Sequence, residues 1–261
     1  MENLLIEEDK PAAGGAVRVL TMNRPEKLNA LNHALSQGLH AALWAAESDD
    51  SVGVIVLTGA GRAFCAGADI AEFSALVPED PKAVTARADL TMGLHLAFSK
   101  LSKPVVAAVR GYAMGGGCGL ALACDLVVAS ETAKFGYPEV KRGIVGAVVT
   151  PNLIRQVGRK AAFELLALGE PVGADKALAL GMINRIVPDD QLSDAAFAIA
   201  TTMAGMSRAA MAATKRLFHR VADVSLEQGL QAGRDTNVMM RGFKKSGVGL
   251  AGQTNPKPAH K

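Results

Sequence analysis

Two glycine-containing stretches of the chain could polarise a carbonyl group. In each, a backbone N–H follows a glycine and stands beside little side-chain bulk: Ala68 follows Gly67, and Gly116 follows Gly115. The second stretch follows a predicted strand at residues 104–109, and helix-forming residues come after it. The amides of this second stretch would therefore lie at a helix N-terminus. Two convergent N–H groups would hold an oxygen that becomes negative during a reaction. The alternative is a pair of unrelated tight turns.

Glu139 is the candidate acid/base. It follows Gly136-Tyr137-Pro138, where a surface helix is expected to begin, so a carboxylate that only stabilises a helix N-terminus is the structural alternative. A glutamate shuttles protons when apolar surroundings raise its pKa. Such surroundings would come from the apolar residues that follow it: Val140, Ile144, Val145 and Val148.

A second carboxylate is missing where one would be useful. Gly119 lies three residues after Gly116, in the first turn of the expected helix, and we expect it to face the same ligand space as Glu139. Because it is glycine, no carboxylate comes from that position. Asp69 and Glu72 are possible substitutes, although their positions are more typical of a helix start and a solvated helix face.

Composition narrows the function classes. Among 261 residues the formal net charge is +3, which is too small to argue for nucleic acid and is compatible with a phosphorylated ligand. No apolar run reaches the ~18 residues that cross a bilayer. The first ten residues carry four acidic side chains, so we expect neither a secretory nor a transit signal.

The cysteines and histidines point away from metal and redox chemistry. Cys65, Cys118 and Cys124 have no CxxC spacing, which indicates reduced thiols and a cytoplasmic protein, and Cys65 is expected to be a small buried filler. The five histidines form no metal-ligand pattern, so no metal is expected. The glycine pairs at 59/61 and 115/117 lack the third glycine of a dinucleotide fingerprint, which argues against a nicotinamide enzyme.

Strands and helices alternate along the first part of the chain, and helices dominate the rest. This order predicts an α/β core over residues 1–195 and a C-terminal helical region with a tail over residues 196–261. The apolar strands at 54–58 and 105–109 each run into a glycine-rich loop. If these strands are neighbours, both loops reach the same edge of the sheet, where ligands of α/β proteins bind.

Together these stretches resemble the crotonase superfamily, the enoyl-CoA hydratase/isomerase family. The resemblance covers residues 5–220 and is highly specific in its order and spacing. The matching stretches are Asn23-Arg24-Pro25 through Asn29-Ala30-Leu31, residues 63–70, residues 103–125, Lys134-Phe135-Gly136-Tyr137-Pro138-Glu139, and residues 169–188.

The resemblance implies a spiral of repeated ββα units and a C-terminal helical region that builds homotrimers, or hexamers as dimers of trimers. It implies an acyl-CoA thioester as substrate, with coenzyme A carried by that substrate and no other cofactor. By motif match, Ala68 and Gly116 would donate to the thioester oxygen, and Glu139 would be a catalytic glutamate. The residues along the CoA would be Lys27, Leu28, Ala66, Ala68, Asp69, Ile70 and Gly116.

The chain departs from the family at two places. The first glutamate of the hydratases falls at Gly119, and residues 143–149 lack the usual run with Pro, Gly and Gly. Family members with one glutamate include enoyl-CoA isomerases, which move one proton between carbons. We therefore expect an enzyme that stabilises a thioester enolate with a single catalytic glutamate, acting as a hydratase or an isomerase. The alternatives are an acyl-CoA hydrolase, a C–C cleaving enzyme on the same scaffold, or a non-catalytic acyl-CoA-binding protein.

Overall fold

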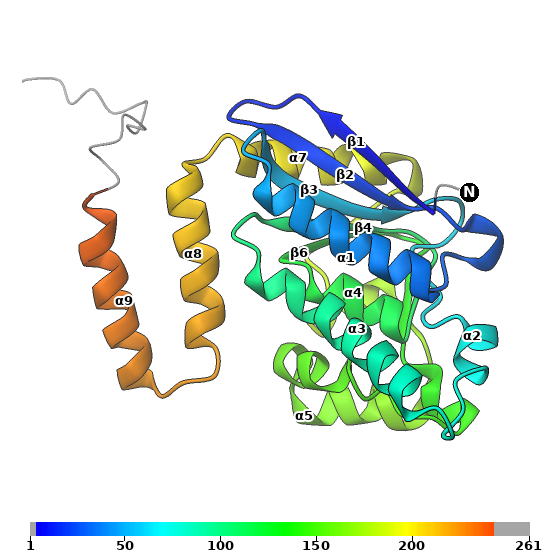
Figure 1. Ribbon diagram of the computed structural model, residues 1–261. Coiled ribbons are helices and arrows are strands. Elements are labelled where there is room, and N and C mark those ends of the chain that lie inside the picture. Colours follow the sequence, from blue (N-terminus) through cyan, green and yellow to red (C-terminus); the bar gives the residue numbers. More distant parts are fainter. Residues whose placement is uncertain (1–3, 243–261) are drawn as a thin grey trace, which may run out of the picture.

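The computed structural model describes residues 4–242, and two β-sheets form its framework (Figure 1). In the larger sheet β1 pairs antiparallel with β2, and each later strand pairs parallel with its neighbour. Its strands, in spatial order, are β1 (Leu5–Lys10), β2 (Ala16–Met22), β3 (Val52–Gly59), β4 (Val105–Val109), β6 (Leu126–Ser130) and β9 (Arg185–Val187). The smaller sheet contains β5 (Tyr112–Met114), β7 (Lys134–Gly136) and β8 (Val172–Gly173).

Helices connect and cover these strands. They are α1 (His33–Ser48), α2 (Ile70–Ser74), α3 (Pro81–Lys100), α4 (Gly116–Ala123), α5 (Thr150–Leu168), α6 (Ala174–Ala179), α7 (Leu192–Ala204), α8 (Arg208–Val221) and α9 (Leu226–Met240). Short 3-10 helices lie at Pro25–Lys27, Pro138–Arg142 and Asp189–Gln191. No helix among residues 4–242 is both long enough and apolar enough to span a membrane.

The chain repeats one connection, which gives the spiral that the sequence predicts. β4 of the larger sheet leads to β5 of the smaller sheet and then to α4, and β6 leads in the same way to β7 and then to α5. β3 begins the series, because Cys65 after it forms a bridge with Ala113 of β5 before the chain enters α2 and α3. Each turn therefore places the end of one large-sheet strand beside the end of the next.

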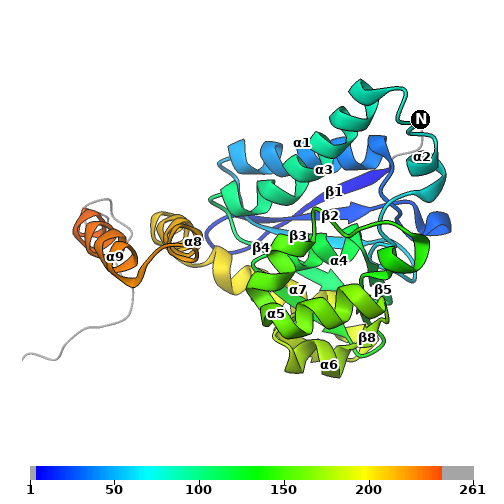
Figure 2. The ribbon, with the colours of Figure 1, turned by 90° about the horizontal axis from the view of Figure 1, so that it is seen from below.

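Both faces of the larger sheet are covered. Val54 and Val56 of β3 pack in a cluster with the alanines of α7, whereas Ile55 and Leu57 pack in the larger core with α1 and α3. Figure 2 shows these helices on opposite sides of the strands. Burial on both faces explains why this strand is a continuous apolar run rather than an alternating one.

The structure moves the boundary between core and appendage. The expected division after residue 195 falls inside α7, whose residues Leu192, Ala196 and Ala200 are buried against the sheet. α8 is bonded to the body through the buried Lys215, whose Nζ donates to Asp125 Oδ2 at 2.7 Å, and α9 packs on α8 at the side of the molecule (Figures 1 and 2). A boundary that keeps α7 whole therefore lies near Ser207, the N-cap of α8. The expected tail at residues 244–261 lies outside the described residues.

Candidate active site

Backbone hydrogen bonds bring the two glycine-containing stretches together. The Cys65 N–H donates to the Tyr112 carbonyl at 2.9 Å, and the Met114 N–H donates to the Cys65 carbonyl at 2.9 Å. On the other side of β5, the Gly115 N–H donates to the Gly136 carbonyl at 2.8 Å. The loop after β3, the loop after β5 and the segment after β7 therefore lie side by side, as the sequence predicts.

The amides of Ala68 and Gly116 have no acceptor among residues 4–242. Leu31 forms a parallel bridge with Ala68: the Leu31 N–H donates to the Gly67 carbonyl, and the Asp69 N–H donates to the Leu31 carbonyl. In such a bridge the Ala68 N–H itself points away from Leu31. A Cβ on Gly67 would lie 3.6 Å from the Gly116 nitrogen and 2.7 Å from the Met114 carbonyl oxygen. Only glycine, here with φ +92°, permits this close approach of the two loops.

Glu139 lies beside Gly115, the residue directly before the Gly116 amide. It is half-buried in the 3-10 helix Pro138–Arg142, and a Cβ on Gly115 would lie 2.7 Å from its Oε1. Gly115 has φ +52°, so the backbone also requires glycine there. The Oε2 atom is buried and has no hydrogen-bond partner among the described residues. Burial raises the pKa of Glu139, which suits a carboxyl that accepts and returns a proton near neutral pH.

The expectation that Gly119 opens onto the same ligand space is wrong. A Cβ on Gly119 would lie 2.4 Å from Val149 Cγ1 and 2.9 Å from His95 Nε2. Gly119 is buried in the first turns of α4, so a carboxylate could enter there only if these neighbours moved. The position lacks both the second carboxylate and the room for one.

The two substitute carboxylates are engaged in structural bonds. Asp69 accepts a hydrogen bond from Arg24 at 3.0 Å and caps α2 by accepting from the Ala71 N–H. Burial raises its pKa, but the bond from Arg24 and the other hydrogen bonds outweigh this and leave the pKa of Asp69 below its ordinary value. Glu72 accepts from the His33 N–H at 2.6 Å. Neither is therefore a candidate for proton transfer.

The other residues expected along a CoA moiety gather at the outer side of the same loop. The Ala66 N–H donates to the Leu28 carbonyl at 2.9 Å, so the segment that carries Lys27 and Leu28 lies beside the amide pair. Lys27 and Ile70 are exposed there. Their role in binding stays a prediction.

Sequence reasoning missed two residues that hold these loops. The buried Asn29 side chain donates to the Ala60 carbonyl at 2.9 Å and the Ala63 carbonyl at 2.8 Å, and its oxygen accepts from the Arg24 N–H at 2.8 Å. His95 of α3 lies with Nε2 3.2 Å from the Gly116 carbonyl. No local sequence pattern predicts either role, because both roles depend on contacts between segments that are distant in the chain.

The cysteines have no visible chemical role in this site. All three are buried free thiols, and burial raises the pKa of Cys65 to about 12. A thiol in that state is a poor nucleophile, which agrees with the filler role expected for Cys65. Among residues 4–242 no three His, Cys, Asp or Glu side chains gather as metal ligands would.

An accessible pair of free amides beside a carboxyl of raised pKa is an arrangement for stabilising an enolate while a proton moves. The sequence pattern that defines the enoyl-CoA hydratase/isomerase family matches residues 12–248. The chain belongs to this family. As a crotonase-superfamily enzyme it carries enoyl-CoA hydratase/isomerase activity, and its substrates are acyl-CoA thioesters.

Individual relatives support this family membership. A protein of Mycobacterium bovis named as a probable enoyl-CoA hydratase is 39% identical, covering 88% of this chain and 86% of its own length. The 2,3-dehydroadipyl-CoA hydratase of Escherichia coli is 39% identical, covering 90% of this chain and 91% of its own. The crystal structure of an enoyl-CoA hydratase from Mycobacterium smegmatis superposes with a TM-score of 0.87 at 35% identity, covering 94% and 93% of the two chains.

Proposed function

We propose that this enzyme moves the double bond of a 3-enoyl-CoA into conjugation with the thioester, using Glu139 as its single acid/base. The observation that carries the proposal is the Glu139 carboxyl, which lies against Gly115 with one buried oxygen that has no hydrogen-bond partner among residues 4–242. Its raised pKa supports a group that takes up a proton and gives it back.

The steps use this chain's own groups. The thioester oxygen accepts hydrogen bonds from the N–H groups of Ala68 and Gly116. Glu139 removes a proton from carbon 2, and the electron pair moves onto the thioester oxygen to give a dienolate. The two amides stabilise its negative charge. Glu139 then returns the same proton to carbon 4, which yields the 2-enoyl-CoA and restores the carboxylate.

We further propose that the CoA moiety lies along Lys27, Leu28, Ala66, Asp69 and Ile70. The exposed Lys27 supplies a positive charge for a phosphate group. The reaction needs no cofactor beyond the coenzyme A of the substrate, because proton transfer exchanges no electrons with an acceptor. The three buried free thiols are compatible with a cytoplasmic enzyme.

Hydration of a 2-enoyl-CoA is the second candidate, because relatives at 39% identity are named as hydratases. It would use the same amides and the same glutamate. It would also need a water molecule to be held and deprotonated beside carbon 3. The enclosed Gly119 offers no carboxylate for that task.

Both reactions can be compared on one preparation. We expect the wild-type enzyme to isomerise 3-hexenoyl-CoA faster than it hydrates crotonyl-CoA at the same concentration, with unchanged rates after EDTA treatment. The appearance and loss of the conjugated thioester absorbance measure the two reactions. Faster hydration would contradict the proposal in favour of the second candidate, and an activity that EDTA removes and a divalent ion restores would contradict the metal-free mechanism.

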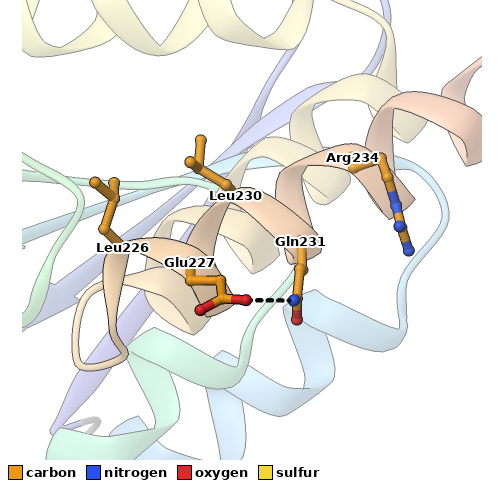
Figure 3. Close-up of a pocket in the computed structure, with 5 residues that line it drawn as sticks. All are labelled: Leu226, Glu227, Leu230, Gln231 and Arg234. Atoms are coloured by element: carbon orange, nitrogen blue, oxygen red, sulfur yellow. Dashed lines mark hydrogen bonds between the residues drawn. The ribbon is translucent and has the colours of Figure 1, made fainter.

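The last two helices, α8 and α9, form a C-terminal arm that supports assembly into a homotrimer, or into a hexamer built from two trimers. Leu226 and Leu230 of α9 project from the same side of the helix, away from Glu227 and Gln231 (Figure 3). They are 79% and 66% exposed, and α9 packs against α8. Leucines one turn apart on α9, the outer helix of the pair, form an apolar face that a neighbouring subunit would cover.

Light scattering tests this assembly. We expect a mass of three or six times 27.0 kDa for the wild-type chain, and a loss of mass when Leu226 and Leu230 are both replaced by serine. Leu178→Ser on α6, where the leucine is 42% exposed, is the matched control and should leave the mass unchanged. A wild-type mass near 27.0 kDa at micromolar concentration would show that the arm is not an interface.

A further inference from the structure

We propose that Val149 determines which reaction this site favours, because its isopropyl group fills the space in which a hydratase would hold its water. The inference rests on the proposed function and adds a specificity-determining residue to it. The position of Val149 relative to three neighbours carries the argument: Gly119, Gly146 and Glu139.

Val149 lies between Gly119, where the second carboxylate is missing, and the carboxyl group of Glu139. Its Cγ1 is 2.4 Å from where a Cβ on Gly119 would lie. Its Cγ2 is 3.1 Å from where a Cβ on Gly146 would lie, and the Glu139 Cδ is 3.5 Å from that same point. One side chain therefore blocks a side chain at position 119 and lies near the catalytic carboxyl, across the Cβ position of Gly146. Val149 is only 4% exposed, so its side chain is held inside the protein against these neighbours.

The backbone keeps Val149 in this place. It is the N-cap residue of α5, and its carbonyl accepts from the Leu153 N–H at 3.1 Å. Thr150 ties the preceding turn to the helix, because its hydroxyl donates to the Gly146 carbonyl at 2.7 Å. A β-branched side chain on a fixed backbone has little rotamer freedom. The isopropyl group is thus a permanent part of the wall.

His95 closes the other side of Gly119 and does not replace the missing base. Its Nδ1 lies 2.8 Å from the Thr91 carbonyl and its Nε2 lies 3.2 Å from the Gly116 carbonyl. Burial lowers the pKa of His95, which favours the neutral ring. Both ring nitrogens face backbone carbonyls, so neither is directed at a water molecule beside carbon 3.

The side chains beside Gly119 affect hydration and isomerisation differently. A water that adds to carbon 3 needs an acceptor that orients it and takes its proton. The methyl groups of Val149 offer no acceptor, and Cγ1 occupies the point at which a side chain on Gly119 would begin. Proton transfer between carbons needs no water, so an apolar wall leaves isomerisation intact while it suppresses hydration.

Three variants test the role of Val149 through the ratio of crotonyl-CoA hydration to 3-hexenoyl-CoA isomerisation. Val149→Thr keeps the volume and adds a hydroxyl, and threonine is a favourable N-cap residue, so this variant should fold. The double variant Gly119→Glu with Val149→Ala supplies a carboxylate and the room for it. Gly119→Glu alone supplies the carboxylate without the room.

We expect the ratio to rise about 10²-fold in the double variant, the lower end of what a positioned acid/base contributes. Val149→Thr should raise it less, and Gly119→Glu alone should not raise it. Val128→Ala in β6 is the matched control, because it removes the same two methyl groups from a buried valine that packs against α7, and it should leave the ratio unchanged.

Two results would overturn the role of Val149. One is an unchanged ratio in folded Val149→Thr and in the double variant. The other is a rise with Gly119→Glu alone that equals the rise in the double variant, since Val149 would then not occupy the space. A different result would contradict the proposed function, namely isomerisation that survives the loss of the Glu139 carboxylate.

Discussion

Glu139→Gln lowers kcat for 3-hexenoyl-CoA isomerisation by about 10²–10⁴-fold, the contribution of a positioned acid/base, and leaves acyl-CoA affinity nearly unchanged. We expect this result because glutamine keeps the shape of the side chain and cannot carry a proton between carbons. Other carboxylates close to the amides do not compensate, since Asp69 is bonded to Arg24 and Glu72 to the His33 N–H. Stopped assays of turnover and a titration with a saturated acyl-CoA measure the two quantities.

The pH profile gives a second readout of the same group. Glu139 must be ionised to remove the first proton, and burial raises its pKa. The wild-type kcat should therefore rise with pH through a midpoint above the ordinary range of glutamate. Glu131→Gln, the same change on an exposed glutamate after β6, should retain both the activity and the profile. Full activity in Glu139→Gln would contradict the mechanism.

The parts of the site that the sequence could predict are local in the chain. A glycine followed by an unencumbered N–H can be read from residues 67–68 and 115–116, and the structure brings the two together through hydrogen bonds of β5. Glu139 follows Gly136-Tyr137-Pro138 and precedes a run of apolar residues, which is the local pattern that made it the candidate acid/base. In each case the relevant geometry is set within a few residues.

The parts that the sequence could not predict depend on contacts between distant segments. Gly119 and Val149 are 30 positions apart, and the start of α5 brings the valine against the glycine. From local helix geometry alone, Gly119 is expected to face the ligand. Packing of α3 and α5 decides otherwise, because His95 and Val149 fill the adjacent space.

The fold shows the same division. Continuous apolar runs identified β3 and β4, whose strands the structure places where the sequence predicts them. β1 escaped notice because it is an edge strand with mostly exposed residues, so it has no hydrophobic pattern. The boundary predicted after residue 195 cuts through α7, although the buried alanines of this helix recur every four residues, as in a helix that covers a sheet.

The Ala68 amide is open to a direct test through Ala68→Pro, which removes the N–H without adding a bulky group over the site. The fold should tolerate this change for two reasons. The Ala68 N–H has no acceptor among residues 4–242, and the residue before it is glycine, which escapes most of the steric restriction that proline imposes on its predecessor. Losing one of two donors to a developing oxyanion lowers kcat by about 10²–10³-fold.

Ala68→Gly is the control, because it removes the methyl group and keeps the N–H, and it should retain near wild-type kcat. Thermal melting of both variants separates a loss of catalysis from a loss of structure. A folded Ala68→Pro enzyme with a kcat within a few-fold of wild type would remove Ala68 from the mechanism. The enolate charge would then rest on Gly116 alone, and a single amide provides less of the stabilisation that a convergent pair does.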